Sequence, residues 1–502
     1  MHSPGKLTSG QAAAALSIAA LLAFVYGRAV YAPCDDAYIF YVYAKNLVNG
    51  NGLTYNGIHV QGFTSVVWVL LLCLFGLLRA PVHVLAEVLS VASGAFALWA
   101  TYYLGRSLSL GRLHSLLPAF LLAVTGDFAL YMAVGLEQAL FTGLVAVVTA
   151  MVLSPGGTQS LKGYALPAVM AAAILTRPEG ALICAALGVV WAFRVRSFWP
   201  ALRCALVVAL VLFPVVVLLR AKYGYWLPNA YYVKSNAGLA NLHHGLRYLL
   251  KAIPRYGLVV GATAAVAGFR LLGERGRPFA QPSVLFGIVA LWIGYTAAQG
   301  GDNMVGGRML IPALPLAYVG LVCFLQQTRA KYLLALVAAL GVALVLSYIN
   351  DARVMRHAHA WRRDFPVRRE AGIYLRDNFP PRTKVALSPA GVIPYYSGLP
   401  TLDMLGLNDE YIAQHGKRDY RLPFGHQAGD GEYVLSQRPD VILFGGALSA
   451  LPGDFISDQE LWWSPEFHEA YRRVRWEGIG YAYVRGVSGQ PTAPGRDPPD
   501  SE

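Results

Sequence analysis

Two adjacent carboxylates, Asp35 and Asp36, follow the first long apolar segment of this 502-residue chain, and no basic residue lies beside them. A carboxylate that leaves water at a membrane boundary is costly unless it is paired or used, so this acidic pair indicates a functional site. We predict that one of the two is catalytic, as a general base or as a stabiliser of developing positive charge. The alternative is that an Asp caps the helix-like run that follows, because Asp is a good N-cap.

A second group of polar residues falls mostly in short loops that the charge pattern places on the same side of the membrane as these carboxylates. Arg and Lys suit a phosphate, which Arg can hold through two parallel hydrogen bonds, and we assign Arg177, Lys234 and Arg308 to this role. Carboxylates, an amide, a phenol and an imidazole suit the hydroxyl groups of a sugar or acceptor. The residues predicted for that second role are Glu179, Asp127, Glu137, Asn229, Tyr232, Asp302 and His426.

Together these residues predict the transfer of a sugar from a polyprenyl-phosphate donor to a hydroxyl acceptor. Such an enzyme must deprotonate or orient the hydroxyl, stabilise positive charge on the sugar ring and neutralise the departing phosphate. A nucleotide donor would need a cytoplasmic site, and no glycine-rich phosphate loop or Walker pattern occurs there. His59, His243 and His244 lack the spacing of metal ligands. We therefore predict no metal site and no required cofactor, while the use of a divalent cation stays open.

Several motifs also have a purely structural interpretation. Residues 177–180 can form a tight hairpin between two apolar runs, and residues 300–308 a glycine-rich turn. Residues 227–234 can belong to an aromatic belt at the membrane surface. Asp127 and Glu137 can mark the two ends of a short loop.

The composition identifies an integral membrane protein, because 56% of the residues are hydrophobic and only 14% are charged, whereas about a quarter of a soluble domain is charged. The net charge of +13 comes from Lys and Arg scattered in short loops. Anionic lipids and membrane topology explain this scatter better than nucleic acid does. The 5 cysteines, most of them in apolar runs, form no disulfide framework or metal pattern.

About eleven apolar runs are candidates for membrane spans, and we expect the shorter ones to be kinked, re-entrant or extended by polar flanks. The first run is interpreted as a retained signal anchor, because it lacks a credible cleavage site. The run 66–78 is too short to span and is assigned to a juxtamembrane helix. The predicted spans are 12–31, 82–104, 115–125, 136–153, 164–176, 180–193, 201–219, 254–269, 283–299, 309–325 and 332–349.

Basic residues gather in alternate loops, which is typical of the cytoplasmic side of multi-pass proteins. If the N-terminus with Lys6 is cytoplasmic, the loops containing Arg106, Arg196, Arg275 and Arg329 are cytoplasmic too. The candidate site then lies outside the cytoplasm, at an inner or plasma membrane. The outer loop that follows residue 219 is itself basic, which weakens the charge argument there, although phosphate binding would explain it.

The composition changes after residue 349. We expect residues 1–349 to form the transmembrane catalytic domain and residues 350–485 an extracytoplasmic α/β domain, since its length is plausible for a domain. Residues 362–380 predict an amphipathic helix, and strands are expected in 384–398 and 438–446. The tail 486–502 is rich in Pro, Gly and acidic residues and is expected to be disordered.

A series of motifs resembles a known family. DDAY at 35–38, NLVNGNGLTYN at 46–56 and QGFTSVVW at 61–68 resemble the first outer loop of GT-C glycosyltransferases. Within that superfamily the chain is most similar to the terminal arabinofuranosyltransferase family of mycobacterial and corynebacterial cell-wall assembly. Further matches are LTRPEG at 175–180, PNAYYVK at 228–234, GGDNMVGGRMLIPALP at 300–315, DMLGLND at 403–409 and GHQAGDGEYVLSQRPD at 425–440.

The resemblance implies a GT-C fold, which is a polytopic α-helical membrane protein with interfacial helices in the first outer loop. It implies catalysis through Asp35 or Asp36 and a lipid-linked donor such as decaprenyl-phosphoryl arabinofuranose. Because the C-terminal domain is more compact than in that family, the acceptor is left open among a glycan, a lipid and a protein. Transfer of mannose, glucose or aminoarabinose remains an alternative. A lipid or solute transporter is less favoured, because no internal repeat is visible.

Overall fold

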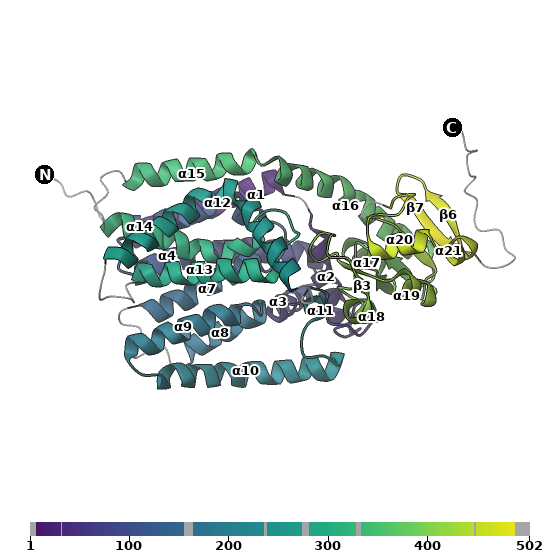
Figure 1. Cartoon of the computed structure of the whole chain (residues 1–502), viewed down its shortest axis with the longest axis horizontal. Coiled ribbons are helices and arrows are strands. Elements are labelled where there is room, and N and C mark those ends of the chain that lie inside the picture. Colours follow the sequence, from purple (N-terminus) through teal and green to yellow (C-terminus); the bar gives the residue numbers. More distant parts are fainter. Residues whose placement is uncertain are drawn as a thin grey trace.

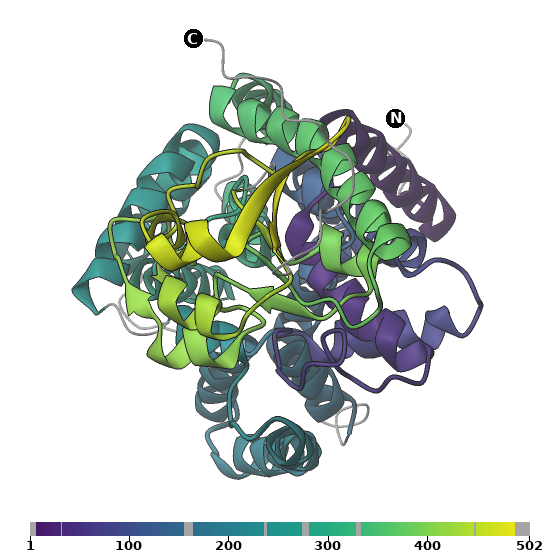
Figure 2. The same cartoon turned by 90° about the vertical axis from the view of Figure 1, so that its right-hand side faces the viewer.

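The computed structural model describes residues 7–31, 33–154, 164–234, 238–273, 281–327, 333–445 and 448–486. Long helices lie side by side along the long axis of the molecule, and a smaller region of helices and strands covers one end of this bundle (Figure 1). The view from that end shows the C-terminal region lying across the tips of the bundle helices (Figure 2). Nearly all of the tail predicted to be disordered lies outside the described residues.

The bundle contains every apolar run that the sequence predicts as a span, and each run is helical. The helices are α1 (Ser9–Val30), α4 (Val82–Ser107), α5 (Arg112–Ala123), α7 (Gln138–Leu153), α8 (Ala165–Thr176), α9 (Gly180–Val195), α10 (Trp199–Tyr223), α12 (Leu239–Gly273), α13 (Gln281–Gln299), η1 (Arg308–Ala313) with α14 (Leu314–Gln327), and α15 (Leu333–Ile349).

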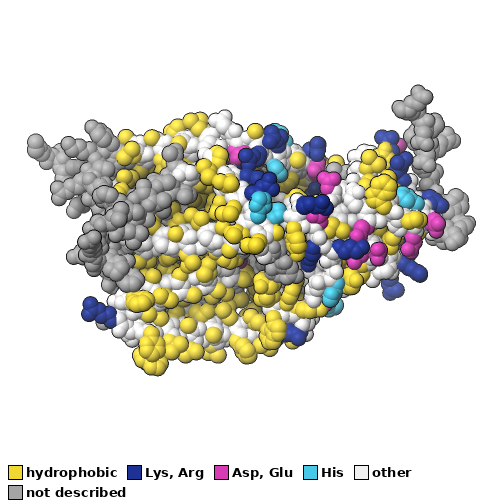
Figure 3. All heavy atoms as spheres, viewed as in Figure 1, with side chains coloured by type: hydrophobic (Ala, Val, Ile, Leu, Met, Phe, Trp, Pro, Cys, Tyr) yellow, Lys and Arg dark blue, Asp and Glu magenta, His cyan; other side chains and the backbone are white. Residues whose placement is uncertain are grey.

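The described part of the chain has 5 helices that are long and apolar enough to cross a membrane alone, namely α1, α4, α10, α13 and the η1–α14 unit. A further pair, α15 and α16 (Ala352–Asn378), meets the same test together and is bent by 53°. The shorter apolar helices α5, α7, α8 and α9 need polar flanks to complete a crossing. The face of the bundle seen in Figure 3 is largely apolar, and so large an exposed apolar surface is typical of a protein embedded in a membrane. The chain is therefore a multi-pass membrane protein.

Short helices lie at the end of the bundle that carries the C-terminal region. The predicted juxtamembrane helix is present as α3 (Val66–Gly76), and α2 (Asp35–Val48) precedes it in the same loop. Two other loops contribute α6 (Gly126–Tyr131) and α11 (Asn229–Lys234). This end of the bundle thus gathers the loops that carry most of the candidate site residues.

The C-terminal region contains a five-stranded sheet in the order β2-β1-β5-β7-β6. The strands β2 (Thr401–Asp403), β1 (Val385–Leu387) and β5 (Val441–Leu443) are parallel and completely buried. The strand β7 (Gly480–Arg485) pairs antiparallel with β5, and β6 (Tyr471–Trp476) pairs antiparallel with β7. A small pair, β3 (Lys417–Arg418) and β4 (Ala428–Gly429), stands apart. Around them lie α17 (Val392–Ser397), α18 (Glu410–His415), α19 (Gly431–Ser436), α20 (Ile456–Trp462) and α21 (Pro465–Ala470).

The helix and strands predicted in this region occur as α16, β1 and β5. The predicted boundary at residue 350 falls at the bend between α15 and α16. Because the two parts share a continuous hydrophobic core, the division into a catalytic domain and a separate α/β domain stays a prediction.

The loop between α1 and α4 holds the C-terminal region against the bundle. The Asn56 amide donates hydrogen bonds to the carbonyls of Pro394 (2.9 Å) and Leu399 (3.0 Å). The buried Tyr55 hydroxyl donates to the carbonyl of Ala390 at 2.5 Å. The motif NLVNGNGLTYN therefore holds the loop and helix that follow β1.

Two further motifs hold the loop that follows β2. The Asn229 amide donates to the carbonyls of Gly406 (2.7 Å) and Asp409 (3.0 Å). Gly62 lies against Asn408 so closely that an added Cβ would meet its Oδ1 at 1.9 Å. A side chain at position 62 would therefore push the two parts apart. The motifs QGF, PNAYYVK and DMLGLND, which are distant in the sequence, form one interface.

Candidate active site

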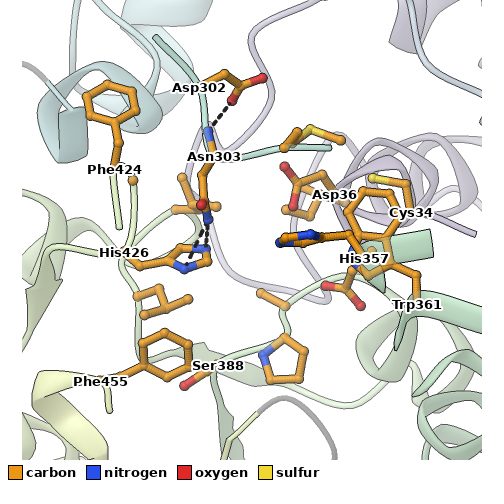
Figure 4. Close-up of a pocket in the computed structure, with 18 of the residues that line it drawn as sticks. Cys34, Asp36, Asp302, Asn303, His357, Trp361, Ser388, Phe424, His426 and Phe455 are labelled. Carbon is orange, nitrogen blue, oxygen red and sulfur yellow. Dashed lines mark hydrogen bonds between the residues drawn. The ribbon is translucent and has the colours of Figure 1, made fainter. Parts of the chain in front are cut away.

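A cavity of about 280 Å³ lies between the end of the bundle and the C-terminal region. Figure 4 shows Cys34, Asp36, His357 and Trp361 together on one side, and Asn303 and His426 across from them. The structure brings five of the predicted site residues to this cavity. They are Asp35, Asp36, Lys234, Asp302 and His426.

Asp36 is the unpaired carboxylate of the cavity. It lies in the first turn of α2, whose N-cap is Cys34, so neither acidic residue caps that helix. Among the described residues, its half-buried side chain has no hydrogen-bond or ion-pair partner. Burial raises the pKa of Asp36, against the opposing effect of Arg308 and Lys234. Such a carboxylate is suited to accept a proton from a ligand in the cavity.

Asp35 is paired through both carboxylate oxygens. Its Oδ2 accepts a hydrogen bond from the backbone N–H of Gly391 (2.9 Å) and its Oδ1 one from that of Val392 (3.0 Å). The Arg368 guanidinium lies 3.3 Å from Oδ1. An added Cβ at Gly391 would lie 1.8 Å from the Asp35 carbonyl oxygen, so this close approach requires glycine. These contacts suit Asp35 to hold the cavity wall rather than to exchange protons.

Lys234, the last residue of α11, supplies an unpaired positive charge. Its ammonium lies 6.0 Å from the centre of the Phe424 ring, and no described carboxylate is within ion-pair distance. Burial lowers the pKa of Lys234, and Asp302 opposes this effect. A cation without a protein partner can receive the phosphate of a ligand.

Arg308 reaches the cavity through Asp302. The two side chains form a bidentate pair, Nε to Oδ2 at 2.6 Å and Nη2 to Oδ1 at 3.0 Å. Burial alone would raise the pKa of Asp302, but Arg308 and Lys234 lower it below its ordinary value. The glycine-rich segment 300–308 is therefore a turn that also contains the Asp302–Arg308 ion pair, and the Asp302 carboxylate lines the cavity.

His426 lines the same cavity as Lys234 and Asp302. The Asn303 amide lies 3.3 Å from its Nδ1 and 3.4 Å from its Nε2, and the Phe455 ring packs edge-on at 5.4 Å. Burial and the nearby Lys234 lower the pKa of His426 to about 4. The imidazole is thus neutral near pH 7 and can donate and accept hydrogen bonds.

Arg177 belongs to a buried charge cluster outside the lining of the cavity. Its Nε and Nη2 donate to Glu179 at 2.9 and 2.6 Å, and its Nη1 donates to Glu137 (2.9 Å) and Gln138 (3.1 Å). The remaining N–H lies 3.8 Å from the Met309 sulfur. Since every donor is engaged, a phosphate would have to displace a protein partner. The predicted ligand roles of Arg177, Glu179 and Glu137 stay predictions.

Asp127, Asn229 and Tyr232 also lie away from the cavity lining. Asp127 is fully buried, and its Oδ2 accepts from the Tyr256 hydroxyl (2.5 Å) and the Gly307 N–H (2.7 Å). Asn229 holds the loop after β2, as described above. Tyr232 packs against Tyr225 and Tyr231, with ring centres 5.9 and 5.8 Å away. Their predicted contacts with sugar or acceptor likewise stay predictions.

Several lining residues were not predicted as site residues. Asn303 follows Asp302 inside a motif that the sequence singled out, so its position could have been noticed. Trp361 and His357 come from α16, and no motif pointed to them. Within the described residues there is no cluster of three or more His, Cys, Asp or Glu side chains arranged for a metal ion.

Comparison with known proteins supports the fold. Residues 353–492 match a family described as a domain of unknown function (DUF8728). No curated protein matches the chain by sequence. ArnT from Cupriavidus metallidurans bound to undecaprenyl phosphate superposes with a TM-score of 0.63 at 12% identity, over 97% of this chain and 100% of that one.

Other solved structures share the same architecture. The Archaeoglobus fulgidus oligosaccharyltransferase in complex with Zn and sulfate gives a TM-score of 0.56 at 14% identity, over 94% of this chain and 73% of that chain. ArnT in the apo state gives 0.52 at 11% identity, over 79% and 86% of the respective chains. These likenesses confirm the predicted fold class. The chain is a multi-pass membrane protein with a GT-C fold.

Proposed function

We propose that the chain is a membrane glycosyltransferase that moves a sugar from a polyprenyl-phosphate donor to a hydroxyl acceptor. The observation that carries this proposal is that one cavity presents a carboxylate, Asp36, and an ammonium, Lys234, neither of which has an ion-pair partner among the described residues. A base for the acceptor and a cation for the leaving phosphate are the two groups that this reaction needs. The position of the cavity at the end of an apolar bundle suits a donor that stays in the membrane.

In the proposed reaction, the acceptor oxygen attacks the anomeric carbon of the sugar while Asp36 takes its proton. The bond between that carbon and the phosphate oxygen breaks, and the electron pair leaves with the polyprenyl phosphate. Lys234 neutralises the leaving phosphate, with Arg308 adding positive charge behind Asp302. Asp302 accepts hydrogen bonds from sugar hydroxyls, and the neutral His426 accepts one or donates one to them.

The lipid donor is supported by the similarity to ArnT, whose structure contains undecaprenyl phosphate. The favoured sugar is D-arabinofuranose, delivered by decaprenyl-phosphoryl arabinofuranose or a similar lipid, because the sequence motifs resemble the terminal arabinofuranosyltransferases. The proposed acceptor is a cell-surface glycan, lipid or glycoprotein. The charge pattern of the loops supports a site and a C-terminal region outside the cytoplasm, on an inner or plasma membrane.

The test is transfer of radiolabelled arabinofuranose from a synthetic polyprenyl-phosphoryl donor in membranes that contain the full chain. We expect labelled membrane or surface glycan with the native chain and with Asp377→Asn, which changes an exposed carboxylate that pairs only with the neighbouring Arg376 among the described residues. Asp36→Asn should reduce the label by about 100-fold or more. Transfer only from a mannosyl, glucosyl or aminoarabinosyl donor would replace the sugar and keep the reaction class. If no donor is used, the glycosyltransferase proposal is wrong and transport becomes the better explanation.

A further inference from the structure

A second cavity, of about 410 Å³, lies where α12, the end of α15 and the start of α16 meet. Three basic residues line it, Lys251 from α12 and Arg353 and Arg356 from α16, together with Ser347, Asn350 and Asp351. All three basic side chains are exposed. In Figure 3 a cluster of Lys and Arg atoms lies where the apolar surface of the bundle gives way to the polar surface of the C-terminal region.

The positive charge of this cavity is not balanced by its own carboxylate. Asp351 is already engaged, because its Oδ2 pairs with Arg255 and its Oδ1 caps α16 by accepting from the Arg353 N–H at 3.0 Å. In the described part of the chain, the side chains of Lys251, Arg353 and Arg356 have no hydrogen-bond or ion-pair partner. Three free cations around one hollow leave a strongly positive site for an anion.

Exposed apolar side chains border the cavity. Leu250 and Ile253 flank Lys251 on α12 and are 64% and 55% exposed, and Leu346 and Ile349 at the end of α15 are 50% and 46% exposed. These residues belong to the lipid-facing surface of the bundle, so the basic groups lie at the depth of lipid headgroups. A ligand that combines a phosphate with acyl chains fits both features.

We propose that this cavity binds the phosphate of an anionic lipid headgroup. Guanidinium and ammonium groups form charge-assisted hydrogen bonds to phosphate oxygens, and the adjacent apolar side chains contact the chains of the lipid. The site is distinct from the cavity that contains Asp36 and Lys234, called the reaction cavity below, and does not depend on the proposed function. The two are neighbours, however, because the same helix α16 gives Arg353 and Arg356 to one and His357 and Trp361 to the other.

The experiment measures thermal unfolding of the full chain in detergent, titrated with dioctanoyl phosphatidylglycerol, dioctanoyl phosphatidylcholine or inorganic phosphate. A ligand that binds the folded state raises Tm in a saturable way. We expect this rise with phosphatidylglycerol and a much smaller one with phosphatidylcholine, whose own ammonium competes for the phosphate. The triple variant Lys251→Gln/Arg353→Gln/Arg356→Gln should weaken phosphatidylglycerol binding by roughly 100-fold.

Two variants separate this site from other causes. The matched triple Arg382→Gln/Arg473→Gln/Arg475→Gln removes the same charge from exposed positions of the C-terminal region and should bind like the native chain. Lys234→Gln, which alters only the reaction cavity, should also keep the Tm rise. Arg356→Gln alone provides a milder variant if the triple variant unfolds, and about tenfold weaker binding is expected.

The outcomes are distinguishable. An equal rise with inorganic phosphate that the triple variant loses would assign the same site to a free phosphate in place of a lipid. A phosphatidylglycerol effect that persists in the triple and single variants, or disappears in Lys234→Gln, would place binding elsewhere and overturn the proposal. The absence of any response to phosphatidylglycerol or phosphate would overturn it as well.

Discussion

The carboxylate of Asp35 accepts a hydrogen bond of 2.9 Å from the backbone N–H of Gly391, 356 positions further along the chain. One partner belongs to the segment between α1 and α4 and the other to the C-terminal region, so this contact closes one wall of the reaction cavity. The next residue, Asp36, projects from the same helical turn into the cavity. The two adjacent carboxylates thus have different surroundings, and different consequences follow from changing them.

Asp36→Asn should reduce the transfer rate by about 100-fold or more, because the loss of a positioned general base has an effect of this order. Its Tm should stay near that of the native chain, since Asp36 has no partner among the described residues. Asp35→Asn should lower Tm together with activity, because the amide loses the charge that pairs with Arg368 and the two backbone N–H groups. Transfer assays and thermal unfolding of both variants beside Asp377→Asn test this division. An inactive Asp35→Asn with native Tm and an active Asp36→Asn would reverse the two roles.

Lys234→Gln should raise the KM for the lipid donor by roughly 10- to 100-fold, because it removes one charge-assisted contact to phosphate. Lys234→Arg should recover part of this loss by restoring the charge. Lys417→Gln, at a largely exposed lysine that pairs with Glu460, serves as the control and should keep the native KM. A normal donor KM in Lys234→Gln would exclude Lys234 from phosphate binding.

The pH profile should report the protonation of Asp36. Burial raises its pKa above the ordinary value of 3.8, so activity should fall on acidification at a higher pH than for an exposed Asp. Removing a nearby positive charge disfavours the carboxylate form further, so Lys234→Gln should shift this acidic limb of kcat/KM upward. His426→Gln should leave the limb in place, because the pKa of His426 is already lowered to about 4. A limb that moves with His426 and not with Lys234 would contradict the assignment of the base.

Arg177→Met should destabilise the protein by about 3–5 kcal/mol, the usual effect of removing one partner from a buried ion pair. The cause is that Glu137 and Glu179 would be left charged and buried. The triple change Arg177→Met/Glu137→Gln/Glu179→Gln should recover much of the lost Tm, because no buried charge remains. Thermal unfolding measures both variants. If Arg177→Met retains native stability and loses donor binding, the predicted phosphate role of Arg177 gains support over the structural one.

Gly62→Ala should loosen the contact between the segment that joins α1 to α4 and the C-terminal region. The added methyl group would meet the Asn408 side chain at 1.9 Å, so the loops must separate. Limited proteolysis of the C-terminal region should be faster, and Tm should fall. Gly188→Ala in α9, where nothing lies within 4 Å of the new atom, is the matched control and should raise stability slightly, since Ala favours helix. Equal proteolysis of both variants would show that this contact does not hold the region in place.

The helical architecture could be predicted because apolar length and periodicity are local properties of the sequence. Every predicted span is a helix, and the strands around residues 385–387 and 441–443 were also anticipated. The motif resemblance led to the correct fold class even though the structural neighbours share only 11–14% identity.

The candidate site was predicted less completely, because residue type does not reveal which hydrogen-bond or ion-pair partners a side chain finds within the protein. Arg177 and Lys234 both follow the pattern of a phosphate ligand, yet all donors of Arg177 are occupied within the protein and the Lys234 ammonium is unpaired among the described residues. Asp127 and Asp36 differ in the same way, because the Asp127 carboxylate accepts hydrogen bonds within the protein and the Asp36 carboxylate has no partner among the described residues. Trp361 carried no signal, since its place in the cavity depends on the 53° bend that turns α16 over the bundle.

The sheet of the C-terminal region meets the reaction cavity at the carboxyl ends of its parallel strands. Ser388 directly follows β1, and Leu405 lies two residues after β2. Open α/β sheets use this same edge for ligands, because loops there can vary while the buried strands stay fixed. For the proposed reaction, replacing these loops is expected to change the acceptor, while Lys234 and Asp302 on the bundle side keep their contacts with the donor.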